Sequence, residues 1–82
     1  MNIRLHSHAK DRLAERGAIE EEALVAVREG ERFPAKYGRA GFRHNFPYDA
    51  EWRGRVYATK QAEAYAVDED GWLVITVLVK YF

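Results

Sequence analysis

Three side chains near the start of the sequence have the chemistry and the spacing of a phosphate-handling site. His8, Arg12 and Arg16 are four residues apart, and this spacing places them along one edge of a helix. A guanidinium binds a phosphate through two hydrogen bonds, and an imidazole exchanges protons near neutral pH. A structural interpretation stays open for each, because Arg16 can complement the helix dipole, Arg12 can pair with a carboxylate and His8 can pack.

Candidates for contact with RNA lie in the middle third of the chain and beyond it. Residues 31–60 hold seven Lys and Arg against three Asp and Glu, interleaved with aromatic residues. Cations beside aromatic rings bind phosphates and stack unpaired bases. The alternative is a solvated sheet face whose cations pair with nearby carboxylates. The predicted RNA-binding residues are Arg43, Arg53, Arg55, Lys60, Tyr57, Thr76 and Lys80.

Cleavage of RNA without a metal needs a base for the 2′-hydroxyl, a cation for the charge on phosphorus and an acid for the leaving 5′-oxygen. Apart from His6, only His8 and His44 among the side chains titrate near neutral pH. Two arginines of the first helix supply positive charge beside His8. The predicted catalytic residues are therefore His8, Arg12, Arg16 and His44.

Composition excludes several other classes of protein. The chain has no cysteine, and its glycines form neither a P-loop nor a dinucleotide fingerprint. We therefore expect no cofactor and no metal site. Thirteen Lys and Arg balance thirteen Asp and Glu, which excludes binding through bulk positive charge but not through a local basic patch. The longest apolar run, residues 72–79, is too short to span a membrane, and no export signal opens the chain. We expect a cytoplasmic protein with no membrane contact.

Two helices are expected to position the first group of residues. Helix-forming residues run from Ser7 to Arg16 and end at Gly17, where a left-handed cap is typical. A second helix is predicted from about Glu20 to Glu29, with acidic residues in its first turn.

The second half of the chain alternates with a period of two, which is typical of strands. Strands are expected around residues 42–48, 53–59, 62–67 and 72–82, with a turn at 68–71. Regular alternation in the last strand places Val74 and Thr76 on the same face. Residues 31–41 stay ambiguous between a loop and a short edge strand, because Pro34 and two glycines interrupt them. The predicted fold is one α+β domain over residues 1–82, with two N-terminal helices packed on one face of a three- to four-stranded antiparallel sheet.

The run from His8 to Gly17, of the form His-Ala-x-x-Arg-x-x-x-Arg-Gly, is followed by an acidic helix and later by the Val74–Leu78 strand. This combination resembles a small family of uncharacterised bacterial proteins that is grouped with RelE-like toxins and with barnase-like and colicin-like RNases. The resemblance spans residues 6–82 and implies two helices on a four-stranded antiparallel sheet. The positions that match its motifs are His8, Arg12, Arg16 and Thr76.

These observations lead to three hypotheses about function. The first is a metal-independent, toxin-type endoribonuclease acting on RNA, for which the resemblance implies an antitoxin-like protein partner. The second is a non-catalytic module that binds RNA or a protein through its basic strands. The third is a homodimer that pairs through the last strand or through the aromatic segment 46–57.

Overall fold

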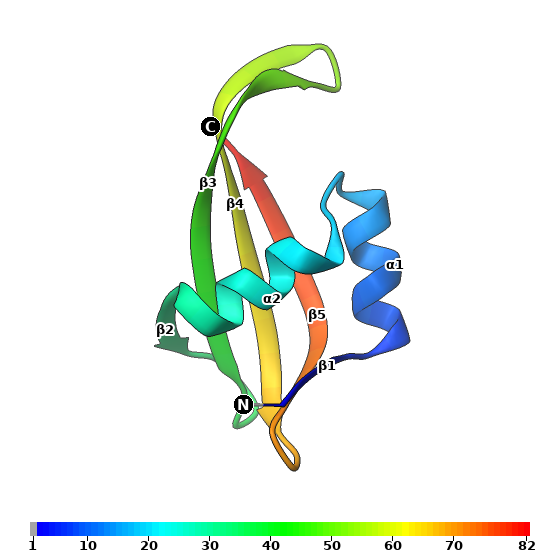
Figure 1. The fold of residues 1–82 in the computed structure, drawn as a ribbon, viewed down its shortest axis with the longest axis vertical. Coiled ribbons are helices and arrows are strands. Elements are labelled where there is room, and N and C mark those ends of the chain that lie inside the picture. Colours follow the sequence, from blue (N-terminus) through cyan, green and yellow to red (C-terminus); the bar gives the residue numbers. More distant parts are fainter. Residues whose placement is uncertain (1) are drawn as a thin grey trace.

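The computed structural model describes residues 2–82, which contain two helices and a five-stranded sheet (Figure 1). The sheet order is β1-β5-β4-β3-β2; β1 runs parallel to β5, and the other neighbours are antiparallel. The two helices and the turn at residues 69–71 confirm the sequence predictions. The elements are β1 (Ile3–Leu5), α1 (Ser7–Glu15), α2 (Glu20–Glu29), β2 (Glu31–Pro34), β3 (Ala40–Trp52), β4 (Arg55–Asp68) and β5 (Trp72–Tyr81).

The expected three- to four-stranded antiparallel sheet is wrong, because the sheet has five strands and includes a parallel pair. The strand β1 was not foreseen, and β2 lies in the segment left open between a loop and an edge strand. The two strands expected around residues 53–59 and 62–67 are one continuous strand, β4. Residues 3–5 pair with residues 72–74, and residues 31–34 pair with residues 40–43. Strands of three and four residues show too few alternations to be recognised in a sequence. They form because a neighbouring strand offers unpaired backbone groups at its edge. The strand β1 also precedes the helices, so α1 starts directly at the edge of the sheet.

Local interactions explain where the helices begin and end. The helix α1 begins after His6, whose Nδ1 accepts a hydrogen bond of 3.0 Å from the backbone N–H of His8. It ends before Gly17, which has the left-handed φ of +74° that suits glycine. At the start of α2, the Glu22 carboxylate accepts a 3.0 Å hydrogen bond from the backbone N–H of Ile19. This is the closing half of a capping box.

The hydrophobic core lies between the helices and one face of the sheet. The helix α2 crosses β3 and β4, and α1 lies beside β5 (Figure 1). Small side chains on β4 allow the close approach of α2, because fully buried alanines occupy its inward positions. The core side chains are Ala9, Leu13, Ala18, Ala23, Ala26, Val27, Ala40, Phe42, Ala62, Ala64, Ala66, Val74 and Val77.

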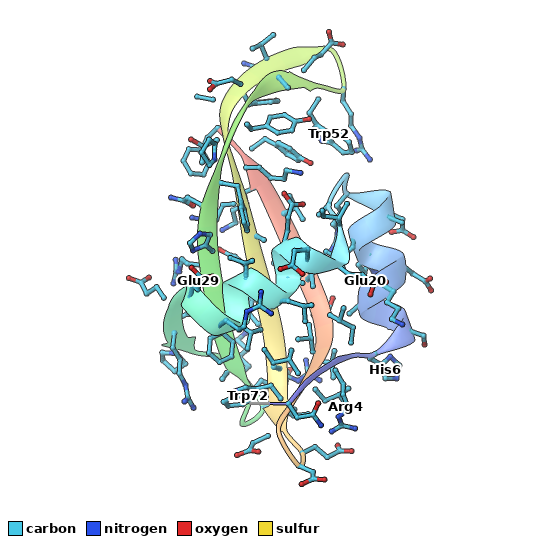
Figure 2. All side chains as sticks on the ribbon, in the orientation of Figure 1. Arg4, His6, Glu20, Glu29, Trp52 and Trp72 are labelled. Atoms are coloured by element: carbon cyan, nitrogen blue, oxygen red, sulfur yellow. The ribbon has the colours of Figure 1, made fainter. Side chains whose placement is uncertain are left out.

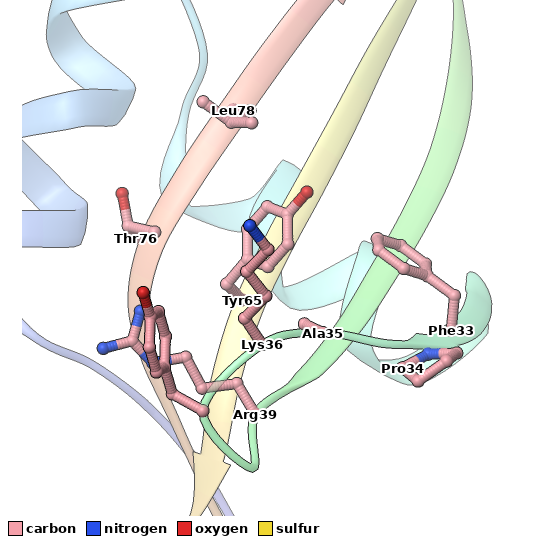
Figure 3. Close-up of a pocket in the computed structure, with 9 residues that line it drawn as sticks. Phe33, Pro34, Ala35, Lys36, Arg39, Tyr65, Thr76 and Leu78 are labelled. Atoms are coloured by element: carbon pink, nitrogen blue, oxygen red, sulfur yellow. The ribbon is translucent and has the colours of Figure 1, made fainter.

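One extra residue in β5 changes the direction of its side chains. The register between β4 and β5 shifts by one residue, which leaves Ile75 without a cross-strand partner. As a result Val74 and Val77 are both fully buried in the core, whereas Thr76 pairs with Tyr65 on the other side of the sheet. The expectation that Val74 and Thr76 share a face is therefore wrong. We call the sheet face opposite α2, where Thr76 lies, the open face (Figure 3).

A buried ion pair connects both helices to the sheet. The Lys60 ammonium on β4 lies 3.1 Å from the Glu22 carboxylate of α2 and donates a 3.0 Å hydrogen bond to the carbonyl oxygen of Gly17. The two side chains are only 10% and 15% exposed. A buried charge is tolerated when it is paired and hydrogen-bonded. Lys60 therefore has a structural role, and its ammonium is not available to RNA, contrary to the prediction from the sequence.

We expect the substitution Lys60→Ala to lower the free energy of unfolding by about 3 kcal/mol, because it leaves the Glu22 carboxylate buried without its partner. Urea unfolding measures this loss. Arg28→Ala is the matched control: it breaks an exposed pair with Glu21, which should cost less than about 1 kcal/mol. Equal losses in the two variants would contradict the structural role of Lys60.

Candidate functional site

The two arginines predicted to be catalytic are engaged elsewhere. Arg12 forms an ion pair with Glu15 at 2.8 Å on the surface of α1. The guanidinium of Arg16 donates a hydrogen bond to the carbonyl oxygen of Val77, at the edge of β5. The carbonyl oxygen of Arg16 accepts a 2.6 Å hydrogen bond from the Tyr81 hydroxyl. Arg16 therefore fastens the end of α1 to β5 and is not positioned to meet a substrate beside His8.

The two histidines predicted to act as acid and base lie in different hollows. His44 is on β3, paired with Ala62 on the helix-covered face, and its ring contacts Phe46 at a centroid distance of 4.8 Å. The hollow next to His44 is bordered by Glu29 and Glu31. His8 lines a separate hollow, in which His44 takes no part. The structure therefore does not bring His8 and His44 together.

The predicted RNA-binding residues are spread over distant places. Arg53 and Arg55 lie at the hairpin between β3 and β4; Figure 2 shows Trp52 of this hairpin far from His6. The Arg53 guanidinium stacks on Trp52 at 4.9 Å and donates to the carbonyl oxygen of Glu15. Arg55 lies 5.8 Å from the ring of Tyr57. This hairpin forms a surface separate from the hollow that holds His8.

Two other predicted cations are paired with carboxylates on the open face. Lys80 lies 3.1 Å from Glu63, whose side chain is only 4% exposed. The buried Nε of Arg43 lies 3.1 Å from Glu31, in an ion pair without hydrogen-bond geometry. The sequence left open that cations of the sheet pair with nearby carboxylates instead of binding RNA. Lys80 and Arg43 both follow this alternative.

One small hollow does bring chemically useful groups together. It has a volume of about 370 Å³ and lies where β1 passes into α1, beside the extra residue of β5. Of the described residues that line it, none is acidic. We call it the imidazole hollow; its residues are His6, His8, Arg39, Ile75 and Thr76.

The groups of the imidazole hollow differ in their hydrogen-bond partners. His6 accepts a hydrogen bond at Nδ1, so its neutral ring carries the proton on Nε2. Among residues 2–82, no hydrogen bond engages the His8 ring and no ion pair engages Arg39. The shift in β5 turns Thr76 to this side of the sheet. The hollow thus combines two imidazoles, a guanidinium and a hydroxyl.

A larger groove adjoins the imidazole hollow and shares Arg39 and Thr76 with it. It measures about 470 Å³ and is formed where the loop after β2 passes over β4 and β5 (Figure 3). Its lining is aromatic and aliphatic, with two cations at its border. We call it the aromatic groove; its residues are Phe33, Pro34, Ala35, Lys36, Tyr37, Arg39, Tyr65, Thr76 and Leu78.

Tyr65 keeps its proton in this groove. Its hydroxyl donates a 3.0 Å hydrogen bond to the Glu63 carboxylate. Burial, the hydrogen bond to Glu63 and the negative charge of Glu63 together raise the pKa of Tyr65, with a smaller opposite effect from Arg43. The groove therefore presents a neutral phenol, whose ring direction is fixed by a buried carboxylate.

The sequence pattern did not single out Arg39 or the aromatic residues of the groove. Arg39, Phe33 and Tyr37 lie in residues 31–41, where Pro34 and the glycines concealed the regular pattern, and Tyr65 lies in β4. A signal was present in Lys36-Tyr37-Gly38-Arg39, because cations next to an aromatic side chain can bind phosphates and stack an unpaired base. His6 was noted only as a third histidine, and its capping role depends on β1.

No family model, curated protein or solved structure matches the chain. Within residues 2–82, no helix is long and apolar enough to cross a membrane, and no group of three or more acidic or histidine side chains is arranged to hold a metal ion.

The raised pKa of Tyr65 predicts a loss of stability in alkali. Because the folded pKa lies above the unfolded value of 10.0, protonated Tyr65 stabilises the fold below about pH 10, and this contribution is lost as the pH rises past the folded value. We expect Tyr65→Phe to be less stable than the wild type by about 1 kcal/mol near pH 8, and this difference to shrink towards about pH 11.

Urea unfolding at the two pH values measures the change. Tyr37→Phe, at a ring that is 85% exposed, is the control and should keep a constant difference from the wild type. A Tyr65→Phe difference that does not change with pH would contradict the role assigned to the Glu63 hydrogen bond.

Proposed function

We propose that this protein binds RNA at the imidazole hollow and cleaves it without a metal ion. The observation that carries the proposal is the meeting of His8, Arg39 and Thr76 in one hollow with no acidic residue among its described lining. An unpaired guanidinium beside a free imidazole suits a phosphodiester, because one binds the anion while the other exchanges its proton.

In the proposed reaction, His8 takes the proton of the 2′-hydroxyl, and the 2′-oxygen attacks the adjacent phosphorus. Arg39 holds the non-bridging oxygens, where negative charge increases. His6 donates its Nε2 proton to the phosphate in a hydrogen bond, as its fixed tautomer allows. The leaving 5′-oxygen takes a proton from solvent, to which the hollow is open. The products are a 2′,3′-cyclic phosphate and a 5′-hydroxyl.

The resemblance to RelE-like proteins supports the same place in the molecule. Of its four motif positions, His8 and Thr76 line one hollow although they are 68 residues apart in the sequence. Arg16, which also matches the motif, fastens the end of α1 to β5 through Val77, whereas Arg12 pairs with Glu15 within α1. A cytoplasmic location is part of this proposal.

A second candidate function is binding of RNA without cleavage. The separation of His8 and His44 into different hollows favours it, since the predicted pair of acid and base is not assembled at one place. The same assay separates the two functions, because the second gives a complex with intact RNA.

We expect purified protein to cleave single-stranded RNA in the presence of EDTA, with products that end in a 2′,3′-cyclic phosphate. His8→Ala should reduce the rate at least about 100-fold, the usual contribution of a positioned base. Gel electrophoresis of end-labelled RNA measures both rate and product.

His44→Ala is the matched histidine variant, because His44 lies in another hollow. We expect it to cleave at the rate of the wild type. A loss of activity in His44→Ala with full activity in His8→Ala would overturn the proposed site, and binding without cleavage by the wild type would favour the second function.

A further inference from the structure

Four residues form a continuous row across the open face, from the edge strand β2 to β5. Phe33 pairs with Gly41, which is in register with Tyr65, and Tyr65 pairs with Thr76. Residues paired in this way lie side by side on one face of a sheet. The row therefore leads from the aromatic groove to the imidazole hollow, with Thr76 belonging to both.

The aromatic end of this row is rigid. The Phe33 ring lies so close to Gly41 that a Cβ there would be 2.4 Å from it, so only glycine leaves room for the ring. Phe33 meets Tyr65 edge to face at 5.9 Å, and the Arg43 guanidinium packs on Phe33 at 4.0 Å. Arg43 is thereby a positioning residue for the groove. Two perpendicular rings are held in place before any ligand arrives.

The loop that borders the groove carries an aromatic residue in a strained conformation. Tyr37 and Gly38 both have a left-handed φ, of 64° and 71°, and the backbone N–H of Arg39 bonds to the carbonyl oxygen of Lys36. Such a turn favours Asn or Gly at the position of Tyr37. The Tyr37 ring is nevertheless 85% exposed, with the Arg39 guanidinium 5.5 Å from it. A strained backbone that presents an exposed ring beside a pocket motivates a functional hypothesis for that ring.

From these observations we propose that the aromatic groove binds one unpaired nucleobase of the RNA whose phosphate lies in the imidazole hollow. This inference rests on the proposed function, because it names a subsite of the same site. Aromatic rings stack on bases of any sequence, and Lys36 and Arg39 at the border match the charge of the backbone. The volume of about 470 Å³ falls within the range of small-ligand pockets, roughly 300–1,000 Å³.

The test is an NMR titration of ¹⁵N-labelled protein with AMP, with UMP and with ribose 5-phosphate, which lacks the base. We expect both nucleotides to shift the amides of residues 33–39, Tyr65 and Thr76. Ribose 5-phosphate should shift only those around the imidazole hollow and bind more weakly. Equal affinities and identical shifts for all three ligands would overturn the base subsite.

Tyr37→Asn provides the decisive variant, because it relieves backbone strain while removing the ring. We expect it to melt at or above the wild-type temperature and to bind AMP about 5- to 100-fold more weakly, as loss of one stacking ring does. Phe82→Asn removes an exposed ring outside the groove and should bind as the wild type does. Wild-type affinity in Tyr37→Asn would overturn the proposal.

The results separate the base subsite from RNA cleavage. Base-dependent shifts in the groove together with intact RNA in EDTA support the subsite and overturn the cleavage. RNA cleavage that depends on His8, together with binding that is independent of the base, overturns the subsite alone. Absence of shifts with every ligand overturns the subsite.

Discussion

The contact between Lys60 and Glu22 is the constraint on which the arrangement of this small domain depends. One carboxylate closes the first turn of α2 and neutralises a buried ammonium of β4, and that ammonium also binds the carbonyl oxygen of Gly17, just after α1. A thin, alanine-rich core supplies little dispersion energy to fix the helices in direction. The hydrogen bonds that the Lys60 ammonium donates to Glu22 and to Gly17 are directional, and they hold both groups against β4. These contacts set where α1 ends and where α2 begins on the sheet. His8 lies at the other end of α1, where β1 and the cap at His6 place it.

The candidate site arises from irregularities at the edges of regular structure. The strand β1 is three residues long, and it places His6 and His8 at the end of the sheet. The unpaired Ile75 turns Thr76 toward them. A strained turn brings Arg39 over the same edge. The short strand β1, the unpaired Ile75 and the strained turn before Arg39 all border the imidazole hollow. Irregular backbone of this kind is over-represented next to functional sites.

The charges of the chain divide into two kinds. Most cations of the open face and of α1 lie against carboxylates or backbone carbonyl oxygens and serve the fold. Arg39 differs, since no carboxylate within residues 2–82 pairs with it and it borders both the imidazole hollow and the aromatic groove. Net neutrality is therefore compatible with an anion-binding site, because one correctly placed cation matters more than the overall balance.

The sequence by itself determined the two helices, the last strand and the turn at residues 69–71, because these depend on local periodicity and capping. It placed the second half of the chain in strands but divided β4 into two. It also singled out His8 and Thr76. Only the tertiary structure decided the mixed five-stranded sheet, since β1 and β2 exist through their partners rather than through any pattern of their own. The tertiary structure also decided the site. The register between β4 and β5 places Thr76 on the open face, and hydrogen bonds give Lys60 and Arg16 structural roles. The loop after β2 brings Arg39 to the hollow that holds the histidines. Distances between residues far apart in the chain are set by packing, which a single sequence does not display.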